Sequence, residues 1–253
     1  MFLIFNKEKI QTYIVSILTV AVLIAVANIK DIGAITTFAQ EKYLPIYNVQ
    51  TDENKVAFTM NCAWNADDID SILETLKNNN VHITFFIVGD WVDKYPEAVK
   101  KIYESGHEIG SHSNTHPHVN NLSTEKNLEE IQLSVKKLEK ITGNKTTLYR
   151  APYGEYNDTV IKTAQENGYY TIQWNLDTLD YKGLTGEGMW NRLKGKIDKG
   201  SIILSHNGTK HTADSLDMLI KNIKASGFEI TTVSDLIYKN NYTINNNGTQ
   251  ISK

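Results

Sequence analysis

The sequence predicts an α/β fold, in which helices cover a mainly parallel sheet that is open or closed into a barrel, with a transmembrane helix before it. Short apolar runs alternate with longer amphipathic stretches along most of the chain, as strands and helices do in βαβ folds. Glycines stand just past four of the amphipathic stretches, where a left-handed residue commonly ends a helix. Residues 10–29 are apolar and uncharged.

The N-terminal segment at residues 10–29 is long enough to cross a bilayer core as a helix, which takes about 20 apolar residues. Lys7 and Lys9 precede it, and positive charge of this kind marks the cytoplasmic side. A buried core helix would normally show a polar stripe, which this segment lacks. Small residues at 25–27 and 37–39 resemble cleavage sites, so cleavage stays open, with an uncleaved anchor favoured.

The strands are expected where short runs are rich in Val, Ile, Phe, Tyr and Thr. They lie at 56–60, 83–88, 108–111, 147–150, 169–174, 201–205 and 229–233. Helical periodicity covers 68–79, 91–105, 123–141, 157–167, 188–198 and 213–226. The resulting organisation is a cytoplasmic N-terminus at 1–9, the anchor at 10–29, a stalk at 30–51, one domain at 52–239 and a loose Asn- and Thr-rich tail at 240–253.

Composition excludes some classes of protein. A hydrophobic content of 41% with 22% charged residues is that of a globular chain. The net charge of -3 gives no reason to expect a nucleic-acid partner. The one cysteine, Cys62, excludes an intrachain disulfide framework.

Polar side chains gather where the predicted strands end, which is where parallel α/β folds place their chemistry. His112 and His116 follow the third strand, and two imidazoles four residues apart can share one divalent metal ion. Arg150 ends the fourth strand in a chain with 24 lysines among 26 basic residues. Its rigid fork can hold a carboxylate as lysine cannot. Asp180 and His206 follow the next two strands, and an Asp near a His commonly fixes one imidazole tautomer.

These segments together resemble the polysaccharide deacetylases of the NodB-homology type, in particular their sporulation-associated branch. The resemblance covers about residues 52–239. The motifs that carry it are Thr84-Phe85-Phe86, Gly106-His107-Glu108-Ile109-Gly110-Ser111-His112 to His116, Arg150-Ala151-Pro152-Tyr153-Gly154, Asp177 to Asp180, and Leu204-Ser205-His206.

The resemblance implies a distorted (β/α) barrel and a metal-dependent hydrolase that removes N-acetyl groups from amino sugars of peptidoglycan or a chitin-like polymer. It implies that His112 and His116 hold the metal and that His206, polarised by Asp180, protonates the leaving amine. Arg150 would orient the catalytic base. In the substrate site, Tyr153 would offer its backbone N–H to the oxyanion and Leu204 would line the acetyl pocket, with Tyr181 and Trp174 as aromatic walls.

The first motif departs from the family pattern at Asn61, where the family has its catalytic Asp. An amide can hydrogen-bond a water molecule but cannot take its proton. Loss of a general base typically slows a reaction by ~100- to 10,000-fold. The departure therefore predicts a slow enzyme or an inactive relative.

The resemblance implies Asp67 as the third metal ligand, with Asp68 next and Cys62, where the commoner family pattern has its metal Asp, as a further alternative. Imidazole with carboxylate oxygen suits zinc, cobalt or manganese, and zinc is expected first. Cys62 can equally be a small buried hydrophobic residue, the commoner state of a free cysteine.

Three functions follow as alternatives. The first is a membrane-anchored deacetylase whose domain faces cell-wall polysaccharide outside the cytoplasm. The second is a catalytically impaired relative that still binds glycans, and the third is an O-acetyl esterase. The sequence does not indicate an oligomeric state.

Overall fold

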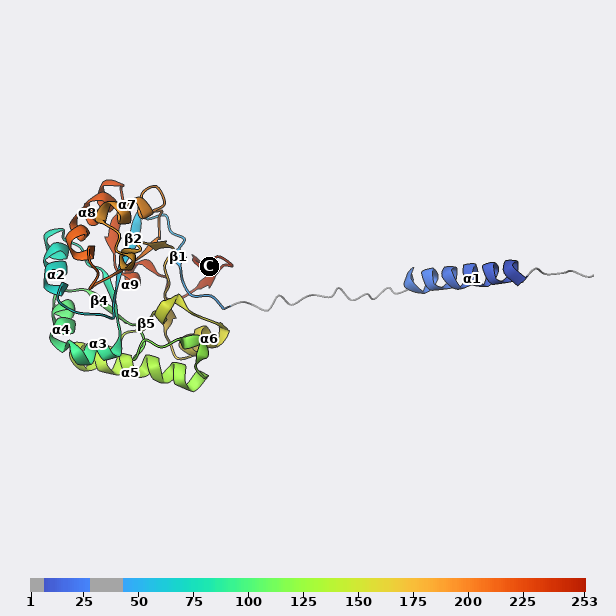
Figure 1. Cartoon of the computed structure of the whole chain (residues 1–253), viewed down its shortest axis with the longest axis horizontal. Helices are drawn as coiled ribbons and strands as arrows, with labels where there is room; N and C mark the ends of the chain where they lie inside the picture. Colours follow the sequence, from blue (N-terminus) through green and yellow to red (C-terminus); the bar gives the residue numbers. More distant parts are fainter. Residues whose placement is uncertain (1–6, 28–42) are drawn as a thin grey trace, which may run out of the picture. The chain divides into compact units, whose positions relative to one another are not determined.

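The computed structural model describes residues 7–27 and 43–253 of the chain (Figure 1). They fall in two compact units, of which one contains the helix α1 (Lys7–Ala27) and the other the folded domain.

The helix α1 is regular, and its hydroxyl side chains bond to their own backbone. The Oγ of Ser16 donates to the carbonyl of Thr12 at 2.9 Å, and the Oγ1 of Thr19 donates to that of Val15 at 2.8 Å. Within the described residues, no helix combines the length and the apolar character needed to span a membrane. The transmembrane helix expected at 10–29 therefore stays a prediction. Residues 28 and 29 lie outside the described part.

The stalk expected at 30–51 belongs in part to the domain. Its residues 30–42 lie outside the described part of the chain, but the segment after them is packed. Ile46 and Val49 are buried. The backbone N–H of Ile46 donates to the carbonyl of Thr171 at 2.8 Å, and that of Val49 donates to the carbonyl of Gly200 at 3.0 Å. The domain therefore begins several residues before position 52.

The centre of the domain is a curled sheet of eight parallel strands. Its order is β6-β5-β4-β3-β2-β8-β7, with β9 pairing with β2. Neighbours in this order pair in parallel. The strands are β2 (Lys55–Cys62), β3 (Thr84–Ile87), β4 (Glu108–Ser111), β5 (Leu148–Tyr149), β6 (Tyr170–Thr171), β7 (Leu176–Asp177), β8 (Ile202–His206) and β9 (Glu229–Thr231). This agrees with the α/β fold and the parallel sheet that the sequence predicts.

Helices cover the outside of this sheet (Figure 1). They are α2 (Ile69–Asn78), α3 (Gly89–Lys94), α4 (Pro96–Glu104), α5 (Thr124–Thr142), α6 (Asp158–Glu166), α7 (Gly186–Leu193), α8 (Thr212–Ala225) and the short α9 (Val233–Leu236). The single helix expected at 91–105 is two, because a residue before proline avoids the helical conformation; Tyr95, with ψ 54°, separates α3 from α4. The helix expected at 188–198 begins earlier, since the hydroxyl of Thr185 caps its first turn.

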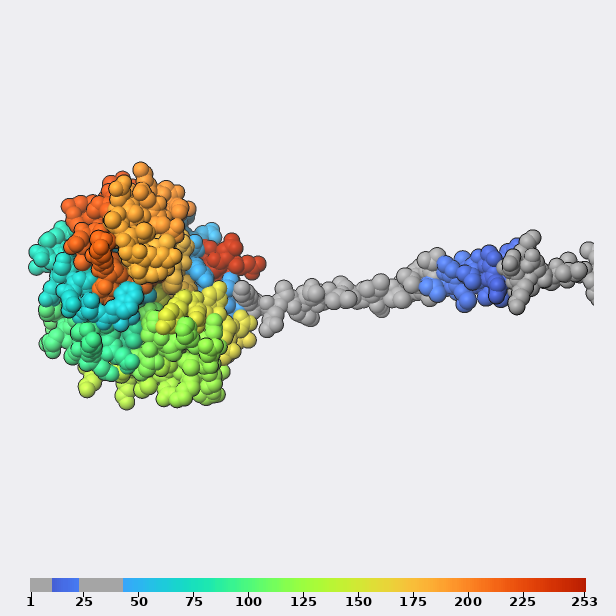
Figure 2. Space-filling view, viewed as in Figure 1, coloured from blue at the N-terminus to red at the C-terminus, as the bar shows by residue number. Residues whose placement is uncertain are grey.

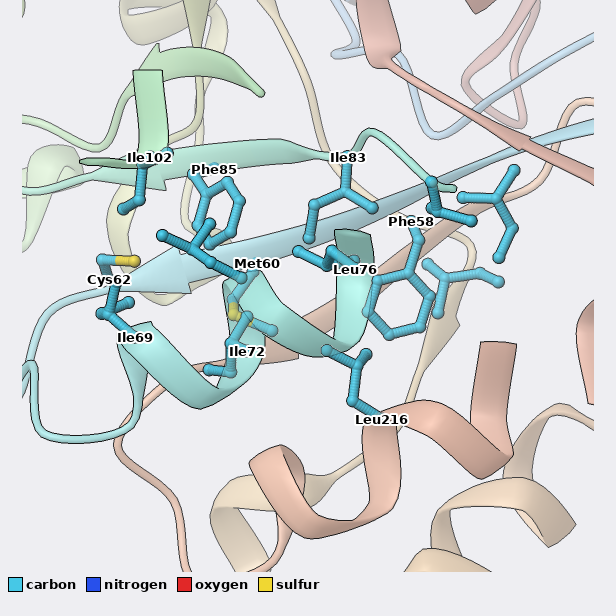
Figure 3. Packing of buried hydrophobic residues seen from close by; sticks show 14 of the residues in the cluster. Phe58, Met60, Cys62, Ile69, Ile72, Leu76, Ile83, Phe85, Ile102 and Leu216 are labelled. Atoms are coloured by element: carbon cyan, nitrogen blue, oxygen red, sulfur yellow. The ribbon is translucent and has the colours of Figure 1, made fainter. Parts of the chain in front are cut away.

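The alternation of side chains along β2 gives the domain two apolar layers. Phe58, Met60 and Cys62 point outward and pack with α2, as Figure 3 shows for Cys62 beside Ile69. Thr59 and Asn61, between them, point to the inner side, since successive side chains of a strand face opposite ways. A second cluster that includes Ala57 and Phe86 lies apart from the outer one.

The C-terminal residues form a sheet where a loose tail is expected from their composition. β10 (Tyr242–Ile244) and β11 (Thr249–Ser252) pair in antiparallel orientation, and β11 pairs in parallel with β1 (Asn48–Val49). In the space-filling view the red C-terminus lies beside the blue segment that precedes β2 (Figure 2). Gln250 supplies the reason. Its fully buried side chain accepts from the N–H of Tyr238 at 2.9 Å and donates to its carbonyl at 2.7 Å.

Replacing Gln250 with Ala is expected to lower the free energy of unfolding by about 1–3 kcal/mol, because it leaves two half-buried backbone groups of Tyr238 without their partner. Urea denaturation followed by circular dichroism measures the change. Thr243→Ala, at an exposed position of β10, is the matched control. Equal unfolding midpoints for the two variants would contradict the role given to Gln250.

Candidate functional site

A cavity of 420 Å³ opens at the carboxyl ends of the parallel strands. Register explains why distant parts of the sequence meet there. Asn61 of β2 lies opposite Phe86 of β3 on one side and His206 of β8 on the other. The residues that line the cavity are Asn61, Ala63, Trp64, His112, His116, Tyr153, Gly154, Trp174, Asp177, Tyr181, Leu204 and His206.

The base of the site is a hydrogen-bonded chain of Arg150, Asn61 and His112. The Nη1 of Arg150 donates to the Oδ1 of Asn61 at 3.0 Å, and the Nδ2 of Asn61 lies 3.2 Å from the Nε2 of His112. The Nδ1 of His112 lies 2.8 Å from the carbonyl oxygen of Arg150. A carbonyl only accepts, so Nδ1 carries the proton and Nε2 accepts from the amide. The amide of Asn61 is thus fixed in one orientation.

Burial keeps His112 in this neutral form. The ring is 2% exposed, and this burial lowers its pKa well below the usual range, with the nearby His116 as a further cause. The single lone pair of the neutral ring, on Nε2, already accepts a hydrogen bond from Asn61. A metal ion at His112 would have to displace that amide.

Arg150 is a fully buried cation. Besides Asn61 it donates to the Oγ1 of Thr59 at 2.9 Å and to the carbonyls of Ile172 and Gln173 at 3.3 and 3.1 Å. Its guanidinium lies 4.0 Å from the centre of the Phe86 ring. Burial lowers the pKa of Arg150 to about 9, so it stays charged at neutral pH. Among the residues that the structure describes, it forms no ion pair.

His206 and Asp180 form the second polar pair of the site, as the sequence predicts. The Nδ1 of His206 lies 2.9 Å from the Oδ1 of Asp180, whose Oδ2 accepts from the backbone N–H of His206 at 2.6 Å. Thr212 donates to the same Oδ2 at 2.8 Å, and the N–H of Tyr181 donates to Oδ1 at 2.8 Å. Four donors therefore hold this buried carboxylate, which leaves the Nε2 of His206 to face the cavity.

Aromatic rings flank the cavity. Trp64 and Tyr181 both lie 5.3 Å from the His206 ring, and both are about half exposed. On the other side, the ring of Tyr153 lies 4.5 Å from that of His116 and stacks at 4.4 Å on that of His118. Rings exposed beside a polar cavity are suited to contact with the apolar faces of a ligand.

His112 and His116 come together as the sequence predicts, with ring centres 4.9 Å apart, but the third metal ligand does not join them. No group of three imidazole, thiol or carboxylate side chains capable of holding an ion is found in the described residues. Asp67 is exposed and does not line the cavity. The carboxylate of Asp68 instead accepts from the side chain of Asn207 and the backbone of Gly208, at 3.1 and 2.7 Å.

Cys62 is excluded by the pleat of β2, which turns it away from Asn61 into the outer apolar cluster. Burial raises the pKa of its thiol well above the usual range, in keeping with a side chain of the core. The donors on the cavity therefore do not fit a divalent ion, and the expected set of Asp67, His112 and His116 is not assembled.

The remaining predicted residues, Leu204 and Trp174, line the cavity. Trp64, Asp177 and Thr212 are not among the predicted site residues. Trp64 and Asp177 stand within two residues of strand ends, a signal that could have identified them. Asp177 is half-buried, and burial raises its pKa. Thr212 begins the helix α8, where no motif marks it.

The chain matches known proteins over most of its length. The Polysaccharide deacetylase family model matches residues 48–172. A peptidoglycan-N-acetylglucosamine deacetylase of Bacillus cereus is 30% identical over 81% of this chain and 77% of its own length. The uncharacterized protein YlxY of Bacillus subtilis is 35% identical over 76% of this chain, and this chain spans only 60% of its length.

A solved structure has the same fold, but its protein is described as a pseudoenzyme and not as a deacetylase. It is a wild-type pseudoenzyme of the CE4 family from Bacillus anthracis, 32% identical, with a TM-score of 0.74 over 77% of this chain and 69% of the other. A mutant of that protein is described as having restored enzymatic activity.

Asn61→Asp is expected to raise the affinity of the cavity for a divalent ion without making position 61 a metal ligand. The amide of Asn61 donates to the Nε2 of His112, whereas a carboxylate has no proton to donate, so the lone pair on Nε2 becomes available to a cation. We expect zinc affinity to rise by about 10- to 100-fold, the usual effect of a partner that orients a metal ligand. Calorimetric titration with zinc measures it.

Asn157→Asp is the control, since it adds the same charge at the exposed cap of α6. Equal zinc affinity in the Asn61 and Asn157 variants would show that position 61 does not control the site.

Proposed function

The chain belongs to the polysaccharide deacetylase family, and on that premise we propose that it binds an N-acetylated amino-sugar polymer of the peptidoglycan or chitin type in this cavity. We further propose that it hydrolyses the acetamide group slowly, because Asn61 occupies the position of the catalytic base. The hydrogen-bonded position of Asn61 between Arg150 and His112 is the observation on which this proposal rests.

The amide of Asn61 blocks the first step of hydrolysis. A base has to take a proton from the attacking water, and a carboxamide has no capacity to hold it. Its oxygen already accepts from Arg150 and its nitrogen already donates to His112. The third metal ligand is missing as well. Both absences slow hydrolysis, because the attacking water would be activated neither by a base nor by a bound metal ion.

Other parts of the site suit a deacetylase substrate. Leu204 is apolar and nearly fully buried on the cavity wall, in keeping with an acetyl methyl group. Trp64 and Tyr181 offer exposed rings on the same side as His206, where sugar rings could stack. The rim is therefore equipped to hold a glycan even though the base is absent.

His206 is the group suited to protonate a leaving amine. Asp180 holds its Nδ1 at 2.9 Å, and such a contact fixes the tautomer and stabilises the imidazolium form. The backbone N–H of Tyr153, in a left-handed turn with φ 58°, is proposed as the donor to the oxyanion. A divalent ion, where a protein of this kind holds one, would supply an activated water; we propose zinc for a variant with Asp at position 61.

The relatives support this proposal. The Bacillus cereus protein is named for deacetylation of peptidoglycan N-acetylglucosamine, and we propose the same polymer class here. A wild-type relative of the same fold is described as a pseudoenzyme, in keeping with glycan binding without efficient turnover. Because peptidoglycan lies outside the cytoplasm, we propose that the domain acts there.

An active deacetylase is the second candidate. The observation that favours it is the His206–Asp180 pair, whose four hydrogen bonds to the carboxylate are intact. A protein selected for binding alone would have no need of an oriented acid.

Glycan binding is expected to be independent of metal. Chitotetraose should bind the protein with the same dissociation constant with and without EDTA, as measured by calorimetry. Trp64→Ala should weaken binding by about 5- to 100-fold, a loss of ~1–3 kcal/mol for an aromatic contact. Leu133→Ala, at an exposed apolar position of α5, is the control. Binding that EDTA abolishes would contradict a metal-free site.

Acetate release is expected to depend on position 61. With zinc present, Asn61→Asp should release acetate from chitooligosaccharides about 100- to 10,000-fold faster than the wild type. Adding His206→Ala to that variant should cancel the gain. Wild-type rates as high as those of the variant would favour the second candidate, and faster release from O-acetylated than from N-acetylated polymer would identify an esterase.

A further inference from the structure

We propose that Glu130, on the side of α5, is a positioning residue that fixes the turn between His112 and His116 and with it the spacing of the two imidazoles on the cavity. That removing Glu130 weakens glycan binding rests on the proposed function. That it moves the imidazole rings of His112 and His116 does not.

The turn between the two histidines has an unfavourable backbone. Ser113 has φ 64° and His116 has φ 57°, in the left-handed region that side chains with a Cβ atom rarely adopt. Two such residues in four persist only where the surroundings hold them. The conformation matters for the site, because the ring of His112 bonds to Asn61 while that of His116 contacts Tyr153.

The carboxylate of Glu130 satisfies the donors of this turn. Its Oε2 accepts from the backbone N–H groups of Asn114 and Thr115 at 2.9 and 2.8 Å, and its Oε1 accepts from the hydroxyl of Thr115 at 3.0 Å. The turn follows the end of β4, so these N–H groups no longer belong to the sheet. A carboxylate only accepts, and here it meets three donors, the match that gives charge-assisted hydrogen bonds.

The carbonyls of the same turn are held from the opposite side. The N–H of Gly89 donates to the carbonyl of Ser113 at 2.9 Å, and that of Asp90 donates to Asn114 at 2.8 Å. A Cβ atom at Gly89 would lie 2.4 Å from the Oδ1 of Asn114 and 2.9 Å from its Cα. The turn therefore lies pressed between the start of α3 and the carboxylate of Glu130, with its N–H and C=O groups bound on opposite sides.

The two helices that hold the turn are tied to each other. Lys137 of α5 pairs with Asp93 of α3 at 2.6 Å. Removing the carboxylate would release the donors of the turn while leaving this frame in place. We therefore expect a local change, in which the left-handed residues relax and His116 moves relative to His112.

The test compares Glu130→Ala with Glu130→Gln and with Glu129→Ala. A glutamine can accept both backbone N–H groups at its oxygen and donate from its nitrogen to the hydroxyl of Thr115, so it should restore the turn. Glu129 is exposed one residue away and pairs with Lys126, which makes it the matched control. Proton–nitrogen spectra of protein labelled with ¹⁵N-histidine report each imidazole directly.

Glu130→Ala is expected to shift the ring signals of His112 and His116 and to leave that of His211 in place. It should weaken chitotetraose binding by about tenfold, the lower end of the effect of residues that orient ligands. Glu130→Gln should return both readouts to within about threefold of the wild type, and Glu129→Ala should match the wild type. Gly89→Ala, which presses on the turn from the other side, should move the same two signals.

Unmoved signals of His112 and His116 in Glu130→Ala would overturn the proposal, even if the melting temperature fell, because the residue would then only stabilise the fold. If Glu130→Ala does not fold, Gly89→Ala with unmoved signals overturns it equally. Shifted signals in a protein whose wild type binds no chitotetraose would support the role of Glu130 and count against the proposed function.

Discussion

The buried guanidinium of Arg150 is the constraint on which the site depends. A guanidinium out of contact with water needs acceptors from the protein, because removing an ion from water costs on the order of several kcal/mol. Here the match comes from Thr59, Asn61 and two backbone carbonyls, with the face of Phe86 against the group. A neutral amide at position 61 supplies an oxygen to Arg150 just as a carboxylate would, but it supplies no compensating charge. An amide at position 61 therefore preserves these hydrogen bonds but offers no group that can take up a proton.

The pleat of a single strand decides what positions 61 and 62 can do. Asn61 points inward to Arg150 and His112, while Cys62 points outward into the apolar cluster beside α2 (Figure 3). The two neighbours therefore have unrelated environments. One keeps a polar network together without a titratable proton, and the other fills a core position with a sulfur atom whose ionisation burial opposes. Neither side of the strand contributes a carboxylate to the cavity.

The sequence predicted the bounds of elements that hydrophobic periodicity determines and the side chains that meet at the ends of parallel strands. β4 at Glu108–Ser111 and the capped start of α5 agree with the expected bounds, and the meeting of His112, Arg150, Asp180 and His206 follows from their places after parallel strands. The prediction from sequence failed where a single tertiary contact determines whether a segment is ordered or which way a side chain points. Gln250 orders a tail whose composition resembles a loose segment. The predicted ligand Asp67 was taken from the family pattern, and a pattern does not say which way a loop side chain points. Glu130 belongs to a helix that shows no motif at that position.

The site is held by contacts that do not involve a metal ion. The turn of His112 and His116 rests on Glu130 and on the start of α3; the acid pair rests on Thr212 and two backbone N–H groups; and Asn61 lies between Arg150 and His112. Each of these supports is a hydrogen bond within the protein, and most of them join buried or half-buried groups. The cavity therefore keeps its shape through hydrogen bonds of the protein itself. A carboxylate at position 61 would meet Arg150, His112 and the His206–Asp180 pair already in position, whereas the third metal ligand would still be missing.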